Sequence, residues 1–269
     1  MIAYAALRCA DLVVRLLPLR ATRLLARALA RLAFGLHVPA RRRAVANFAR
    51  LPNAGSPAAC TRRAREAFEH FALSYVDLLR LRRLPADAVR RAVALEGERH
   101  VEEAARSGRG VIVLSVHAGS WEWGACLLSS LGLKLHLAAR AQDGPAVERW
   151  FAAHRARHGV DRLEERPLWS AAARALRRRE WVAIMGDRVA PGGRDSVCAW
   201  AAAVARRTGA LILPALILRR PDGGYVAHFE PPLTPHECLA GGFRQAVWRH
   251  LEGSPGQWLA FEPLPEGLA

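Results

Sequence analysis

Residues 110–124, with the sequence GVIVLSVHAGSWEWG, constrain the fold of this chain more than any other stretch. The apolar, largely β-branched run over 111–116 is typical of a strand buried on both faces. His117 ends that run, and a short turn of small residues follows. The stretch from Trp121 has helical character, with Ser120 as the expected N-cap. A strand, a turn and a helix in this order predict an α/β domain with His117 at the carboxyl end of a core strand, where such domains place reactive groups.

Further segments continue the alternation of strands and helices along the chain. Strands are predicted at 93–97, 133–139, 181–185, 211–218 and 225–229, and helices at 58–83, 98–107, 145–158, 168–179, 197–207 and 242–252. The turn formers at 219–224 indicate a hairpin. This order predicts a three-layer α/β fold, in which helices flank a mixed, largely parallel sheet.

The composition excludes several classes of protein. With 269 residues, 52% apolar and 24% charged, the chain is neither disordered nor a polytopic membrane protein, and its length suits one domain with a helical extension. Its five cysteines lie far apart without a CxxC pair, which indicates reduced thiols rather than disulfides or a zinc site. No P-loop or dinucleotide fingerprint is present, and His154 and His158 on one helix face have no indicated third ligand, so we expect neither a cofactor nor a metal.

The net charge of +16 is concentrated at the N-terminus, where residues 1–50 hold ten arginines and one aspartate. On a helical wheel, arginines and leucines occupy opposite faces: Arg20, Arg23, Arg27 and Arg31 against Leu25, Leu29, Leu32 and Leu36. This pattern is typical of a helix in a membrane interface, with arginines toward lipid phosphates and leucines in the acyl region. The alternative is an amphipathic helix packed on the protein's own core. We therefore divide the chain into a membrane-associating segment, 1–50, and an α/β domain, 51–269.

The sequence of residues 1–50 argues against a signal peptide, a transmembrane helix and a nucleic-acid-binding segment. Arg8, Asp11, Arg15 and Arg20 interrupt its apolar residues, so the sequence predicts neither a signal peptide nor a clear transmembrane helix. No nucleic-acid-binding motif or aromatic-interleaved basic stripe accompanies the charge, which disfavours nucleic acid as a partner. An anionic membrane surface is the expected acidic partner.

His117 and Glu122 together have a chemical use. A neutral imidazole can take a proton from a hydroxyl, and a carboxylate on its other nitrogen fixes the tautomer and stabilises the imidazolium. The alternative is a salt bridge without chemistry between a strand-end histidine and a helix-start glutamate.

The stretch resembles the H-x4-D/E motif of the bacterial lipid A biosynthesis (lauroyl/myristoyl) acyltransferases, within the lysophospholipid/glycerolipid acyltransferase superfamily. His117, Gly119, Trp121 and Glu122 match the pattern H-x-G-N-W-E, whereas Ser120 replaces its Asn. The resemblance implies that His117 is the general base and Glu122 its orienting partner. The turn through Gly119 and Ser120 would border the substrate, and its amides could stabilise the oxyanion.

Two later positions extend the resemblance. Arg140 follows the strand at 133–139, where many family members carry an arginine, and could bind a substrate phosphate or the oxyanion. Gly186, Asp187 and Arg188 resemble the family's G-D-Q or G-D-R motif and would shape the site or bind the acceptor head group. The alternatives are a solvated charge and a plain turn. Residues 255–259 are similar to the family's closing strand.

The resemblance implies direct transfer of a fatty acyl chain from an acyl-carrier-protein or CoA thioester to a hydroxyl of a lipid acceptor. It implies a lipid A precursor or related glycolipid as acceptor, and a location on the cytoplasmic face of the inner membrane, peripheral or with one N-terminal anchor. No cofactor or metal is needed. The loop at 189–197 is shorter than in the family and the tail after 259 lacks its Arg-rich continuation, so a pathway-specific aminolipid or other acceptor stays open.

Three other classes of protein remain alternatives: a hydrolase, a catalytically silent membrane-binding protein and a nucleic-acid-binding protein. The absence of a G-x-S-x-G elbow argues against a serine hydrolase.

Overall fold

The computed structural model describes residues 2–51, 53–139, 141–142, 144–163, 168–188 and 196–262. Arg140 and residues 189–195 of the shortened loop over 189–197 therefore lie outside the described residues.

A single sheet organises the α/β part of the chain. Its strands are β1 (Val93–Glu96), β2 (Val111–Ser115), β3 (Leu135–Leu137), β4 (Val160–Arg162), β5 (Trp181–Met185), β6 (Leu211–Arg219) and β7 (Tyr225–Phe229). Within the described residues the spatial order is β1-β7-β6-β2-β5-β3-β4. Only the β6–β7 hairpin is antiparallel among these pairs, so the predicted mixed, largely parallel sheet is confirmed.

Helices cover both faces of this sheet. They are α1 (Ile2–Leu16), α2 (Leu19–Leu36), α3 (Val38–Ala49), α4 (Pro57–Leu81), α5 (Ala86–Arg91), α6 (Glu98–Arg106), α7 (Trp121–Ser130), α8 (Pro145–Ala156), α9 (Leu168–Arg177), α10 (Val197–Thr208), α11 (Pro235–Leu239) and α12 (Gly242–Leu251). Alternate residues of β2 face opposite sides: Ile112 and Leu114 pack with α9, α10 and α12, and Val111 and Val113 with α5, α6 and α7. The predicted three layers follow from this alternation.

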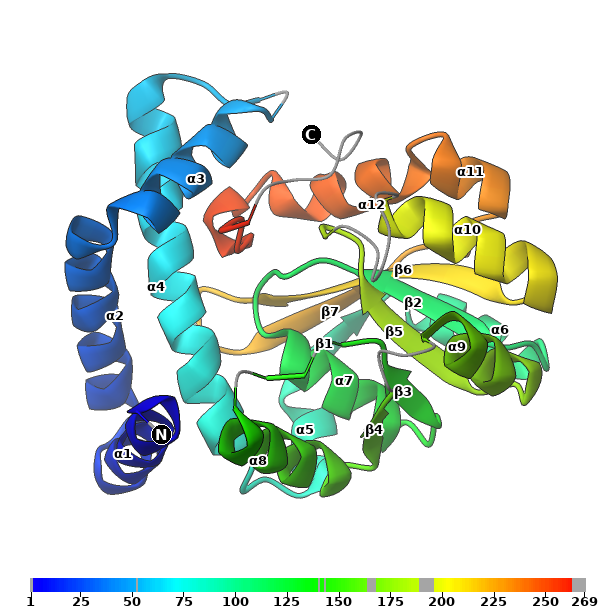
Figure 1. Cartoon of the computed structure of the whole chain (residues 1–269), viewed down its shortest axis with the longest axis horizontal. Helices are drawn as coiled ribbons and strands as arrows, with labels where there is room; N and C mark the ends of the chain where they lie inside the picture. Colours follow the sequence, from blue (N-terminus) through cyan, green and yellow to red (C-terminus); the bar gives the residue numbers. More distant parts are fainter. Residues whose placement is uncertain are drawn as a thin grey trace.

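The helices α1 to α4 stand together at one side of the sheet (Figure 1). Pro18 separates α1 from α2. Among the described residues, no helix combines the length and the apolarity needed to cross a bilayer.

The arginine face of α2 packs against the protein, and its leucine face is exposed. Arg31 Nε lies 2.7 Å from Glu69 Oε1 of α4, and Arg27 approaches the same carboxylate. Arg23 lies 4.0 Å from Asp77 of α4. These arginines therefore meet acidic groups of the protein itself. The leucines point away from the body and are exposed: Leu24 65%, Leu25 40%, Leu29 56%, Leu32 59% and Leu36 74%.

The closing segment also differs from its predicted form. Residues Pro255–Gln257 form a short 3-10 turn, η1, instead of the start of a strand. Only one bridge, between Ala118 and Trp258, joins this segment to the turn after β2 in the described residues. A strand does not form because Pro255 cannot donate a ladder hydrogen bond and the chain turns at once.

Candidate active site

A cavity of about 600 Å³ opens beside the carboxyl end of β2. Its polar lining includes His117, Ser120, Glu122, Arg155 and Arg188. Its walls are otherwise mostly apolar and come from the sheet, α4, α7 and α8, including Val113, Leu127, Leu137, Ala183, Ala215 and Phe229. An apolar cavity with a few convergent polar groups has the character of a small-molecule site.

His117 meets a buried carboxylate that comes from the neighbouring strand. Ser115 of β2 pairs with Met185 of β5, so the residues two positions further along, His117 and Asp187, again lie side by side. His117 Nδ1 lies 2.8 Å from Asp187 Oδ1, and the His117 backbone N–H donates to Oδ2 at 3.0 Å. The indole N–H of Trp258 donates to Oδ2 at 3.1 Å. Asp187 is thus held in place by three contacts.

The electrostatics of the pair favour an ionised carboxylate. Burial works to raise the pKa of Asp187, but the positive charge and hydrogen bonds of His117, together with Arg188, outweigh it and hold that pKa below its usual range. A charged Asp187 accepts a hydrogen bond from Nδ1–H, which leaves Nε2 without a proton and makes it the basic nitrogen of the neutral ring. The His117 side chain is 23% exposed, so the ring reaches the cavity surface.

Arg188 approaches the same imidazole nitrogen as Asp187. Its Nε is 3.4 Å from His117 Nδ1, and its guanidinium forms an ion pair with Glu262. A nitrogen that donates to Asp187 cannot also accept from Arg188, so the shorter contact with the carboxylate decides the tautomer. Arg188 therefore acts on this site through its charge.

Glu122 has a different partner from the one expected. Its two carboxylate oxygens accept from Arg155 of α8, at 2.7 Å from Nη2 and 3.3 Å from Nε. Both side chains are 6% exposed. The expectation that Glu122 orients His117 is corrected by this geometry, because Asp187 occupies Nδ1. A planar guanidinium offers two donors to one carboxylate, which a single imidazole nitrogen cannot match.

The turn between His117 and α7 is held by its backbone. Gly119 has a φ of +55°, and a Cβ there would collide with the Ile217 carbonyl. The amide of Ala118 donates to Val116 O and that of Gly119 to Gln257 O, so these two N–H groups are already used and do not serve an oxyanion. Ser120 occupies the N-cap position of α7 and lines the cavity, but its side chain makes no capping hydrogen bond.

The remaining predicted site residues have separate positions. Gly186 lies against the ring of Phe243, where a Cβ would clash, so a glycine is needed there for close packing. Gly186 does not line the cavity. Arg140 lies outside the described residues. In the part of the chain that the structure describes, no three His, Cys, Asp or Glu side chains gather in a way that could hold a metal ion.

Sequence reasoning missed two contributors to the site, Arg155 and Trp258. Arg155 lies on a helix far from the motif, and nothing in its spacing pointed to Glu122. Trp258 belongs to the segment that resembles the family's closing strand, which was the available signal for a position near the site.

The comparisons agree with the resemblance. Residues 3–259 match the family model described as bacterial lipid A biosynthesis acyltransferase. No curated protein matches the chain.

Proposed function

This chain belongs to the bacterial lipid A biosynthesis acyltransferase family, and we propose that it moves a fatty acyl chain from an acyl-carrier-protein or CoA thioester to a hydroxyl of a lipid acceptor. The family assignment supports acyltransferase activity. The observation that carries the finer proposal is the His117–Asp187 pair, with an imidazole that opens on an apolar cavity.

In the proposed reaction His117 acts first as base and then as acid. Its Nε2 takes the proton of the acceptor hydroxyl while the oxygen attacks the thioester carbonyl carbon. The tetrahedral intermediate collapses with cleavage of the C–S bond, and the imidazolium returns the proton to the leaving sulfur. Asp187 stabilises the imidazolium between these steps. Acyl transfer is direct, so no acyl-enzyme, metal or cofactor takes part.

The cavity supports a fatty acyl donor. Burial of each methylene of an acyl chain between apolar walls contributes about 0.8 kcal/mol of binding. The walls extend from His117 along the sheet to Val113, Leu127 and Leu137, which suits a chain lying beneath α7 with its carbonyl at His117.

The oxyanion and the acceptor depend on cationic groups. By the family resemblance, Arg140 is proposed to bind the oxyanion or a substrate phosphate. Arg188 is a second cation, beside the His117 imidazole. A lipid A precursor or related glycolipid is the proposed acceptor, with a pathway-specific aminolipid or other acceptor as the alternative.

We further propose that α1 and α2 lie against the cytoplasmic face of the inner membrane. The exposed leucines of α2, with Leu12, Leu16 and Leu17 nearby in the sequence, would enter the acyl region. Exposed arginines, including Arg20, Arg42 and Arg43, would add attraction to anionic lipids.

The first experiment incubates the enzyme with a lipid extract and a mixture of acyl-carrier-protein and CoA thioesters, and follows lipid masses. We expect one lipid to gain one acyl mass with the native chain and none with His117→Ala. Release of free fatty acid without acyl transfer would indicate a hydrolase and contradict the proposal. Transfer that persists in His117→Ala would contradict the role of His117.

Vesicle flotation tests the membrane proposal. Replacement of Leu25, Leu29 and Leu32 with Gln is expected to lower binding to anionic vesicles at least tenfold, since three buried leucines contribute several kcal/mol. Leu239→Gln on α11, where the leucine is 52% exposed, is the matched control. Equal flotation of both variants, or equally tight DNA binding, would contradict the proposed membrane surface.

A further inference from the structure

A buried polar cluster lies beside the active site but does not line the cavity. Its centre is Asp77, fully buried in α4, and Arg219, 8% exposed at the end of β6. Burial of two charges is costly unless both are well paired. The other contacts of Asp77 and Arg219 show what this buried pair holds in place.

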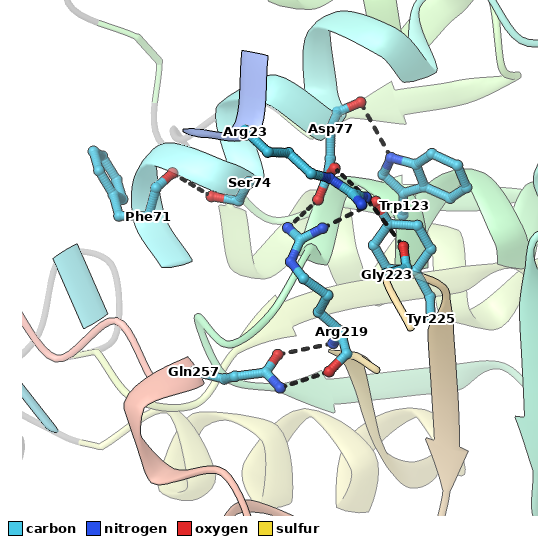
Figure 2. Close-up of polar contacts among 9 residues, drawn as sticks. All are labelled: Arg23, Phe71, Ser74, Asp77, Trp123, Arg219, Gly223, Tyr225 and Gln257. Carbon is cyan, nitrogen blue, oxygen red and sulfur yellow. Dashed lines mark hydrogen bonds and ion pairs between the residues drawn. The ribbon is translucent and has the colours of Figure 1, made fainter. Parts of the chain in front are cut away.

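The charged groups of the cluster meet at Asp77. The Arg219 guanidinium forms an ion pair with Asp77 Oδ2 and lies 3.3 Å from the Tyr225 hydroxyl. Arg23 of α2 reaches the same carboxylate and also donates to the Gly223 carbonyl at 3.0 Å. Figure 2 shows both guanidinium groups converging on the Asp77 side chain. The position of Arg219 is thus fixed through its side chain.

The backbone of Arg219 in turn holds Gln257. The Gln257 amide accepts from the Arg219 N–H and donates to the Arg219 carbonyl, each at 2.8 Å (Figure 2). This pair of hydrogen bonds resembles one rung of a sheet, made by a side chain. Gln257 is 3% exposed, so neither bond competes with water.

The segment that Gln257 anchors runs directly beside the catalytic turn. The Gln257 carbonyl accepts from the Gly119 amide at 3.0 Å, and the Leu259 amide donates to the His117 carbonyl at 2.8 Å. Between them, Trp258 donates its indole N–H to Asp187 at 3.1 Å. The segment therefore contacts both members of the proposed catalytic pair.

We infer that Asp77, Arg219 and Gln257 form a positioning cluster, which keeps residues 257–259 in register so that Trp258 and the backbone hold Asp187 and His117 in their reactive geometry. These are positioning residues, because none of them touches the substrate cavity in the described structure. The inference rests on the proposed function only for its kinetic consequence. The geometric consequence, the state of the His117 ring, stands independently of any substrate.

If residues 257–259 shift away from the catalytic turn, the His117 ring is expected to lose its preference for the Nδ1–H tautomer. In the native protein Asp187 Oδ2 is occupied by two donors, so Oδ1 accepts from Nδ1–H. Without the Trp258 donor the carboxylate can rotate, and the Nδ1–H tautomer is no longer imposed. The other charged groups at the ring are Arg188 and, paired with it, Glu262.

Two variants test the inference from different points. Gln257→Met keeps a similar volume but removes both hydrogen bonds to Arg219. Trp258→Phe keeps an aromatic ring between Phe48 and Trp248 but removes the indole donor. The matched control is Gln245→Met, the same replacement at an exposed position of α12. Thermal melts of all variants measure their stability.

The first readout is the nitrogen NMR spectrum of the His117 ring, assigned with His117→Ala. We expect the native ring to be protonated at Nδ1, with a downfield proton signal, and both test variants to show mixed tautomers. The second readout is the split of kcat from KM. Loss of a hydrogen bond to a charged group predicts a fall in kcat of roughly tenfold or more, with KM changed less than about twofold.

The double variant sharpens the test. If Gln257 acts through Trp258, the fold-loss of kcat in the double variant Gln257→Met/Trp258→Phe should be far smaller than the product of the fold-losses in the two single variants. Native tautomer and native kcat in a folded Gln257→Met protein would overturn the inference. Absence of His117-dependent transfer in the native protein would instead overturn the proposed function, while the tautomer readout would still judge the cluster.

Discussion

Two buried carboxylates near the cavity differ in the basic group with which each is paired. Glu122 faces the guanidinium of Arg155, and Asp187 faces the imidazole of His117. A guanidinium keeps its proton at any accessible pH, whereas an imidazole gains and loses one near neutrality. The Glu122 pair can therefore only hold α7 to α8, but the Asp187 pair can pass a proton.

Exposure separates the two pairs as well. The His117 side chain is 23% exposed and that of Asp187 is 3% exposed, so the imidazole reaches the cavity while the carboxylate is shielded from water. Glu122 and Arg155 are equally sealed, at 6% each. The comparison teaches that reactivity at this cavity follows from the partner of each carboxylate and not from its place in the sequence motif.

The largest expected effect separates the two acids by activity. Asp187→Asn removes the charge that fixes the His117 tautomer, and we expect kcat to fall by about 10²–10⁴-fold. Glu122→Gln should lower kcat per folded molecule by less than about tenfold. Steady-state kinetics on both variants, corrected for the folded fraction, measures the difference; the opposite ranking would return the orienting role to Glu122.

The next effect concerns stability. Glu122→Ala leaves Arg155 buried and unpaired, which predicts a loss of about 3–5 kcal/mol in the free energy of unfolding. Replacing both residues with leucine removes both charges, so the double variant is expected to regain most of that loss. Urea titrations measure the three free energies. A double variant as unstable as Glu122→Ala would contradict a mainly structural pair.

A pH effect should follow from His154, next to Arg155 in α8. Burial lowers the pKa of His154 to about 4 from 6.5, so the unfolded chain binds this proton more tightly than the folded one. The free energy of unfolding should therefore decline as the pH falls from about 6.5 to 4, by at most about 3 kcal/mol from this group.

His154→Leu is expected to flatten this part of the stability curve, measured by urea titrations at several pH values. His236→Leu, which replaces an exposed histidine, serves as the control. Equal slopes for the native chain and His154→Leu would show that other groups govern the acid sensitivity.

The smallest expected effect belongs to Arg188. Its side chain is 30% exposed and forms an ion pair with Glu262, which offsets its charge. Arg188→Met should therefore change kcat by less than about fivefold. The pKa of Asp187 should rise toward its usual range as this cation is lost. A fall in kcat comparable to that of Asp187→Asn would give Arg188 a direct part in the chemistry.

Local pattern was sufficient for much of the fold and for one half of the site. The β-branched run before His117 and the turn after it predict a buried strand that ends just before His117, and the structure has that strand. The apolar runs at 181–185 and 211–218 likewise became β5 and β6. These features depend on neighbours in the chain, which a sequence displays directly.

The partner of His117 did not follow from local pattern. Glu122 is five residues away along the chain, but the parallel register of β2 and β5 brings Asp187, seventy residues away, to Nδ1. The orientation of α2 was also decided by distant groups, since Glu69 and Asp77 of α4 draw its arginines inward and leave its leucines outside.

By itself, the sequence determined the alternation of strands and helices, the place of His117 at a strand end and the family. Only the tertiary structure decided which acid orients the imidazole, which acid is neutralised by Arg155 and which face of α2 is exposed. The physical reason is that periodicity and turn chemistry act over a few residues, whereas the pairing of buried charges is selected by strand register and helix packing across the whole chain.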